Sequence, residues 1–256
     1  MSVDIGGRLR FVRDRHKLSQ RELATYLMSE WLSTFCPSVL VADAQAIQNY
    51  YLERYGKRST FIAYGAEVGR VTGTEVLHRL GVESGRYFLY VTRMEPENHP
   101  LEVREAFEKV VTALRLVLVG DAPYSQEYIR RVRDTSDPRV VLPGAIYGTG
   151  YHELQSHCFA YIHATEVGGT HPALIEAMGR GALVLYRDTP ENAEVAGDAG
   201  MPFGPENLTA QIRRVLEMSD AERDRYRRRA MERVRQKYSW DAVTEEYERL
   251  FQRLLG

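Results

Sequence analysis

FAYIHATEVGGTHPALIEAM, residues 159–178, says more about the architecture of this chain than any other stretch. Its first five residues form an apolar run that is typical of a buried strand. Pro172 marks a helix start, because proline loses no hydrogen bond at the first helical position and its φ is already set. Gly168 and Gly169 stand between the two and let the backbone approach a ligand closely. The stretch therefore predicts a strand, a glycine turn and a helix in succession.

The turn also predicts an anion site. The free N–H groups at the start of a helix and the helix dipole both favour a negative charge, such as a phosphate. Thr170 or His171 is placed to be the N-cap. Glu176 follows about one turn later, where its carboxylate would repel phosphate but could accept the hydroxyls of a sugar diol. The alternative is a strand-to-helix turn that is well capped and has no ligand.

Length and composition indicate an ordinary globular protein. A chain of 256 residues can form one large or two small domains, and its 44% hydrophobic and 27% charged residues exclude a disordered protein. A formal net charge of -1 gives no overall attraction to nucleic acid or acidic lipid. Cys36 and Cys158 do not form a CxxC motif, and no apolar run reaches the roughly 18–20 residues of a membrane span. We expect a reduced, cytoplasmic location, with any membrane contact made peripherally at the inner face.

From about residue 37, short apolar runs alternate with amphipathic segments, which is the pattern of βαβ units. The expected strands are 37–43, 60–64, 87–93, 114–120, 139–142, 159–163 and 182–186. The expected helices are 44–55, 101–113, 126–133, 151–157, 172–179 and 192–196, then 207–218, 221–237 and 241–255. This order predicts an α/β fold with a doubly wound parallel sheet, a helical N-terminal segment and C-terminal helices. Ligands of such sheets bind at the carboxyl ends of the strands.

The first residues differ in character from the rest. Residues 5–24 resemble the opening helix and the start of the second helix in lambda-repressor-like helix-turn-helix domains. Residues 25–35 supply no recognisable recognition helix, and without that helix a DNA reader loses its means of reading sequence. We therefore do not expect specific DNA binding. The alternatives are an amphipathic basic helix that packs on the main domain, or a segment joined by fusion or rearrangement.

Several further motifs follow one another in a known order. They are AYGAE at residues 63–67, YVTRMEPEN at 90–98, LPGAIYG at 142–148, the stretch 163–178, and YSWD at 238–241 before a final helix. Together they resemble the donor-binding half of a retaining GT-B glycosyltransferase of family four. The stretch 163–178 is similar to the rhamnosyltransferase-type subgroup. In the common family pattern two glutamates are separated by seven residues, whereas here Gly168 stands at the first of these positions and Glu166 lies two residues earlier.

The resemblance implies roles for individual residues in binding a nucleoside diphosphate sugar. Arg93 and Glu166 would be the catalytic residues, with Arg93 on the diphosphate and Glu166 near the hexose. Glu176 would accept the ribose hydroxyls. The donor-binding residues would be Gly65, Asn98, Ile146, Tyr147, Gly168, Gly169, Thr170, His171 and Glu176. Asn98 stands where the family often has a further basic residue.

The resemblance also implies a function and an organisation. Residues 1–36 would be a helical segment, 37–236 the nucleotide-sugar-binding Rossmann-like domain, and 237–256 a C-terminal helix. The chain would transfer a hexose or deoxyhexose with retention to a sugar or lipid-linked acceptor, in cell-surface polysaccharide synthesis. No metal or other cofactor is expected, because Arg93 and the helix dipole supply the positive charge. The acceptor domain would be missing or reduced, so a partner chain would have to supply it before transfer is efficient.

Two other functions are compatible with the sequence. One is a regulatory protein that senses a nucleotide sugar and carries an N-terminal DNA-binding segment, and the other is a catalytically silent homologue. His152, His157, His163 and Cys158 do not have the spacing of a standard metal site. The basic run at residues 222–237 predicts a solvated helix face, or a surface that docks on anionic lipid.

Overall fold

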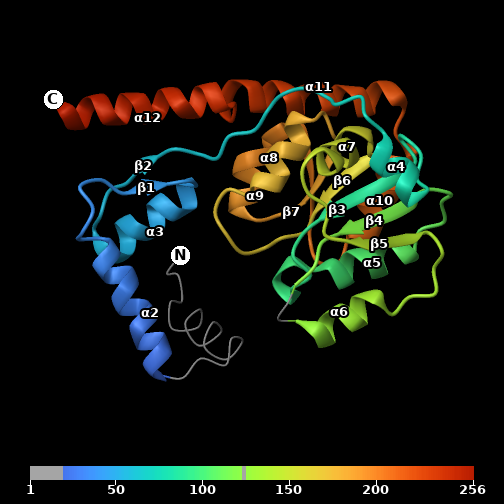
Figure 1. Ribbon diagram of the computed structural model, residues 1–256, viewed down its shortest axis with the longest axis horizontal. Helices are drawn as coiled ribbons and strands as arrows, with labels where there is room; N and C mark the ends of the chain where they lie inside the picture. The colour runs from blue at the N-terminus through green and yellow to red at the C-terminus, as the bar shows by residue number, and fades with distance from the viewer. Residues whose placement is uncertain (1–19, 123–124) are drawn as a thin grey trace. The chain divides into compact units, whose positions relative to one another are not determined.

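The computed structural model describes residues 20–122 and 125–256 (Figure 1). The resemblance to a helix-turn-helix over residues 5–24 therefore lies outside the described residues, except for the five that begin helix α2. Within the described part, residues 20–42 and 47–61 form a small unit, and residues 43–46 and 62–256 form a large one. This division differs from the boundary expected at residue 36.

The small unit is built from two helices and two short strands. Helix α2 spans Gln20–Ser33, strand β1 Val41–Ala42, helix α3 Gln45–Tyr55 and strand β2 Thr60–Phe61. The strands pair in parallel, with Val41 opposite Thr60. The strands expected at 37–43 and 60–64 are thus two residues long and form a separate sheet. Val41 is 40% exposed, so this pair is not buried on both faces as strands of a main parallel sheet are.

The large unit contains a parallel sheet of six strands. These are β3 Tyr87–Val91, β4 Arg115–Val119, β5 Val140–Gly144, β6 Ala160–His163, β7 Val184–Arg187 and β8 Gly200–Phe203. Their order in the sheet is β5-β4-β3-β6-β7-β8, and every neighbouring pair is parallel. The chain therefore builds outward from β3 in one direction and from β6 in the other. This confirms the predicted doubly wound sheet and puts its switch point between β3 and β6.

Alternating side chains bury both faces of this sheet. In β3, Phe88 and Tyr90 belong to a hydrophobic cluster on one face, while Tyr87 and Leu89 are buried on the other. The hydroxyl of Tyr87 donates a hydrogen bond of 2.8 Å to the carbonyl of Leu154 in a covering helix. Burial on both faces explains why these strands are apolar throughout in the sequence.

Helices cover the two faces as separate layers (Figure 1). On one face, helix α5 (Pro100–Glu108) packs with both α6 (Gln126–Arg133) and α10 (Leu208–Glu217). The opposite layer consists of α4 (Glu75–Leu80), α7 (Thr149–His157), α8 (Pro172–Gly179), α9 (Pro190–Ala196) and α11 (Asp220–Lys237). Two 3₁₀ turns, η1 (Pro96–Asn98) and η2 (Gly197–Ala199), complete the unit together with the last helix, α12 (Trp240–Leu255).

In the large unit, β8, α4 and α5 differ from the sequence-based expectation. Strand β8 was not predicted, since Gly200 and Pro202 are unfavourable in strands; it is an edge strand, where proline is tolerated. The six-residue helix α4 was also not predicted. The helix expected at 101–113 ends at Glu108, because Arg139 Nη1 donates to the carbonyls of Val110 (2.6 Å) and Thr112 (3.2 Å) and holds that segment outside the helix.

The predicted C-terminal helices are confirmed, together with their start signals. Ser219 and Glu222 form a capping box at α11, in which the Ser219 hydroxyl accepts from the Glu222 N–H at 3.3 Å. Ser239 caps α12 by accepting from the N–H of Ala242 at 3.2 Å. In the described part of the chain, every helix is too short or too polar to cross a membrane.

Candidate functional site

Two loops meet at the switch point of the sheet. Residues 92–99 follow β3 and residues 164–171 follow β6, so both lie at the carboxyl ends of adjacent strands. They are joined directly, because the N–H of Glu166 donates to the carbonyl of Glu97 at 3.3 Å. In doubly wound sheets, ligands bind outside the carboxyl ends at the switch point. The loops carry most of the predicted site residues.

The start of α8 presents free backbone donors in the second loop. The N–H groups of Gly169, Thr170 and His171 have no acceptor within the described ranges 20–122 and 125–256. Gly168 is exposed and Gly169 half-buried. His171 is the N-cap, with no hydrogen bond from its side chain to the helix. Thr170 is buried, and its hydroxyl donates to the carbonyl of Asp43. The start of α8 therefore carries a row of backbone donors without an acceptor among the described residues, and whether it binds an anion stays a prediction.

The two glycines have close neighbours that the sequence did not reveal. Gly168 has a φ of +146°, and a Cβ there would lie 2.7 Å from His171 Cε1. A Cβ on Gly169 would lie 2.5 Å from Asp43 Oδ1. Both glycines thus make room for neighbouring side chains, in addition to any ligand. The contact with Asp43 also places a carboxylate beside the donors, where it competes with a bound anion.

Two histidine rings lie against each other at this turn, tilted by 52°. The rings of His163 and His171 have centroids 4.9 Å apart, and both nitrogens of His163 are buried without a partner among the described residues. Burial, and then the neighbouring His171, lower the pKa of His163 well below 6.5. Burial also lowers the pKa of His171, although Asp43 opposes the shift. Both rings are therefore neutral near pH 7 and add no positive charge to the turn.

Arg93 and Asn98 differ in exposure. The Arg93 side chain is 76% exposed, with Nε 3.7 Å from Glu95 Oε2, so it is able to reach a ligand. Asn98 is only 4% exposed, and its Nδ2 donates to the Arg93 carbonyl at 2.9 Å. Its own carbonyl accepts from the Tyr90 hydroxyl at 2.5 Å. The Asn98 amide therefore supports the loop that carries Arg93, and it does not face the open side where a donor contact was predicted.

Glu166 belongs to a charged network that sequence reasoning missed. Its Oε2 lies 2.8 Å from His99 Nε2 and 3.5 Å from Arg187 Nη2. His99 Nδ1 lies 3.1 Å from Glu102 Oε2, and Arg187 Nη1 lies 3.2 Å from the same carboxylate. His99 has a φ of +55°, the only positive φ of a non-glycine residue in the described part of the chain. The one signal in the sequence that could have pointed to His99 was its position directly after the predicted site residue Asn98.

The network shifts the pKa of Glu102. Burial raises the pKa of the Glu102 carboxyl, but the hydrogen bond from His99 and the charge of Arg187 outweigh burial, so the pKa is lowered from 4.5. Both ring nitrogens of His99 face carboxylates, Nδ1 that of Glu102 and Nε2 that of Glu166. Together with Arg187, His99 therefore links the two carboxylates and holds Glu166 in place.

Glu176 has partners on the neighbouring helix α7. The Tyr151 hydroxyl donates to Glu176 Oε2 at 2.5 Å, and Gln155 Nε2 donates to the Tyr151 oxygen at 2.8 Å. Glu176 itself is half-buried. Sequence reasoning singled out neither Tyr151 nor Gln155, because no local pattern links residues on two different helices.

The remaining predicted residues lie elsewhere. Ile146 and Tyr147 follow β5, the outermost strand on one side of the sheet, and Tyr147 is 85% exposed. Gly65 is buried, and a Cβ there would lie 2.6 Å from Trp240 Cε3. The structure thus brings Arg93, Asn98 and Glu166 together at the switch point, and it packs Gly65 against the start of α12.

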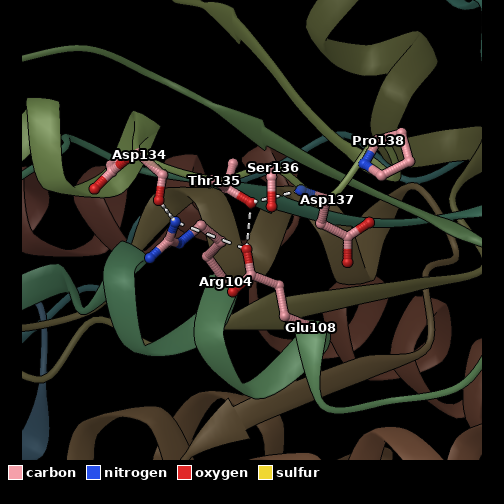
Figure 2. Close-up of a pocket in the computed structure, with 7 residues that line it drawn as sticks. All are labelled: Arg104, Glu108, Asp134, Thr135, Ser136, Asp137 and Pro138. Atoms are coloured by element: carbon pink, nitrogen blue, oxygen red, sulfur yellow. Dashed lines mark hydrogen bonds and ion pairs between the residues drawn. The ribbon is translucent and has the colours of Figure 1, made fainter.

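A pocket of about 550 Å³ lies at the opposite, amino edge of the sheet, between α5 and the segment that precedes β5. Figure 2 shows the side chains that line it. It is lined by Arg104, Glu108, Asp134, Thr135, Ser136, Asp137 and Pro138. Arg104 donates to the Asp134 carbonyl, and the Thr135 hydroxyl donates to Glu108 Oε1 at 2.5 Å. These hydrogen bonds join residues of the pocket lining to one another, and none of the lining residues is a predicted site residue. Within the described residues, no cluster of three or more His, Cys, Asp or Glu side chains is arranged to hold a metal ion.

Known proteins share this architecture. A family model described as "Glycosyl transferases group 1" matches residues 85–219. Anabaena Alr3699/HepE in complex with UDP-glucose is similar with a TM-score of 0.78 and 18% identity, over 93% of this chain and 69% of that one. A glycosyltransferase from Rickettsia africae is similar with a TM-score of 0.77 and 17% identity, over 85% of this chain and 63% of that one. Sucrose-phosphate synthase from Thermosynechococcus elongatus has a TM-score of 0.76 and 18% identity, over 94% of this chain and 65% of that one.

The similarity to these three solved structures is evidence about the fold of the chain. At such identities they show a shared GT-B-like, Rossmann-like architecture, which confirms the predicted fold class. This chain spans about two thirds of the length of the three proteins.

Proposed function

Because this chain belongs to the glycosyl transferases of group 1 and has a GT-B-like fold, we propose that it binds a nucleoside diphosphate sugar at the switch point of its sheet. It would take part in transferring the hexose or deoxyhexose, with retention at the anomeric carbon. The observation that carries the proposal is the row of N–H groups at Gly169, Thr170 and His171, which have no acceptor among the described residues.

The diphosphate would lie against this row. Backbone donors at a helix start bind phosphate well, and the dipole of α8 adds to the attraction. Arg93, on the adjacent loop, would add a charge-assisted contact, for which its planar guanidinium is suited. Both groups would stabilise the charge that develops on the leaving diphosphate. The mechanism needs no metal, so we expect binding and turnover to be unchanged by EDTA.

Glu166 would face the hexose. His99 and Arg187 hold its carboxylate at 2.8 and 3.5 Å, so its orientation is fixed before the donor arrives. The acceptor would be a sugar or lipid-linked sugar of cell-surface polysaccharide synthesis. Anomeric NMR of the sugar first released from the donor tests retention, because a retaining enzyme releases the anomer that it received.

UDP is the first probe, since the Anabaena protein named above is in complex with UDP-glucose. Titration calorimetry with UDP, GDP and dTDP tests the proposal directly. The nucleotide that binds should lose about tenfold in affinity in Arg93→Ala and in Glu176→Ala, because each variant loses a charged hydrogen bond.

Arg249→Ala is the matched control for the arginine. Arg249 pairs with Glu245 and Glu246 on α12, so its loss should leave nucleotide affinity unchanged. A folded protein that binds none of the three nucleotides would refute the proposal. Binding that is unaffected in both site variants would mean that the nucleotide binds elsewhere.

A further inference from the structure

Glu176 is held by one oxygen and open at the other. Its Oε2 accepts from the Tyr151 hydroxyl at 2.5 Å, and its Oε1 has no partner within the described residues. A carboxylate on a half-buried helix surface would otherwise rotate among several positions, each of which must be given up on binding. One fixed oxygen therefore leaves the other aimed in a set direction.

Tyr151 is itself fixed from behind. Gln155 Nε2 donates to its oxygen at 2.8 Å and also to the carbonyl of Ala173, at 3.4 Å, in the first turn of α8. Gln155 is fully buried, so this anchor moves little. The chain of bonds runs from a buried amide through a phenol to a carboxylate and links α7 to α8.

The direction of these bonds is unambiguous. Burial, and then the nearby Tyr161 and Glu176, raise the pKa of Tyr151 far above 10. The phenol therefore keeps its proton at every working pH and donates it to Glu176. It also accepts the Gln155 N–H, so its bonding capacity toward both neighbours is used.

We propose that Tyr151 is a positioning residue that sets Glu176 to accept the two vicinal hydroxyls of a ribose, which makes the site selective for ribonucleoside diphosphate sugars. This inference rests on the proposed function. The open Oε1 accepts one hydroxyl, and the remaining lone pair of Oε2 accepts the other. A 2′-deoxyribose offers only one of the two, so UDP- and GDP-sugars would be preferred over dTDP-sugars.

The test compares each nucleotide with its 2′-deoxy counterpart by titration calorimetry on the full chain. UDP should bind about tenfold more tightly than dUDP, the effect of one hydrogen bond to a charged group. If GDP is the better ligand, GDP and dGDP replace them. In Tyr151→Phe the ratio should fall to about threefold or less, because Glu176 is no longer held. A role confined to packing α7 against α8 would change stability and leave this ratio unchanged.

Tyr87→Phe is the matched control. It also removes one buried phenol hydroxyl that bonds to α7, through the Leu154 carbonyl, and it should keep the full ratio. Gln155→Met keeps the Tyr151–Glu176 bond but removes the support behind it, so it should give an intermediate ratio and serves as the second variant should Tyr151→Phe not fold. In a Glu176→Gln background, adding Tyr151→Phe should cause no further loss, since both act through one contact.

The failures are distinguishable. If UDP binds and the ratio in Tyr151→Phe stays within twofold of the unaltered protein, the inference is wrong while the proposed function stands. The same holds if the unaltered protein does not distinguish UDP from dUDP, or GDP from dGDP. If no nucleotide binds at all, the proposed function fails and this inference fails with it.

Discussion

The negative charge of Asp43 should repel the diphosphate that we propose as the ligand. Its carboxylate lies against Gly169, beside the free N–H groups that would hold a diphosphate. Removing the charge in Asp43→Asn should tighten UDP binding by about two- to fivefold, the size expected for repulsion between partly exposed charges. The bond from the Thr170 hydroxyl goes to the Asp43 backbone carbonyl, so the substitution preserves it. Titration calorimetry measures the change, which should shrink as salt is raised.

Asp198→Asn is the control for this effect. Asp198 lies in η2, directly before β8 and thus at the amino edge of the sheet, and its side chain is 80% exposed. Its loss should not alter UDP affinity. Weaker binding in Asp43→Asn would show that the carboxylate helps the ligand, against the electrostatic argument.

At the scale of elements, Glu102 on helix α5 contacts His99 after β3 and Arg187 at the end of β7. Because the folded-state pKa of Glu102 is lowered from 4.5, its ionised form stabilises the protein above that value, and this stabilisation is lost as the pH falls through the lowered pKa. Glu102→Gln should therefore cost up to about 1 kcal/mol at pH 7. The difference from the unaltered protein should shrink steadily as the pH is lowered below 4.5, in urea unfolding over a series of pH values. Glu105→Gln, also on α5 but 52% exposed, should show no such dependence.

For the whole molecule, the nucleotide should act as a stabilising ligand. UDP at about 100 times its Kd adds about 2.7 kcal/mol to the free energy of unfolding of the part that binds it. In a unit of about 200 residues, this raises the unfolding midpoint by roughly 5–10 °C in differential scanning calorimetry. The shift should belong to the large unit and should be reduced in Glu176→Ala at the same UDP concentration. An equal shift in that variant would count against the proposed site.

Much of the architecture could be predicted from local patterns. Strands β3 and β6 are apolar along their length because both faces of a parallel sheet are buried, and this is visible in the sequence alone. Pro172 starts α8 as predicted, and Ser219 and Ser239 start the last two helices. Strand β8 escaped prediction because Gly200 and Pro202 argue against a strand. Its hydrogen bonds come from pairing with β7, and pairing leaves no mark in the residues of one strand.

The position of the candidate site follows from the same local patterns, since a glycine turn between a buried strand and a helix start can be recognised in a few residues. The surroundings of the Glu166 and Glu176 carboxylates cannot be recognised in this way. Tyr151 is 25 positions from Glu176, His99 is 67 from Glu166, and Asp43 is 127 from Thr170. Contacts over such separations form when strand order and helix packing bring distant segments together, and neighbouring residues in the chain carry no trace of them. The amino-acid order was therefore sufficient for most of the large unit's elements and for the glycine turn before α8, whereas the orientation of Glu166 and Glu176 and the opposing charge at the turn depend on the folded arrangement.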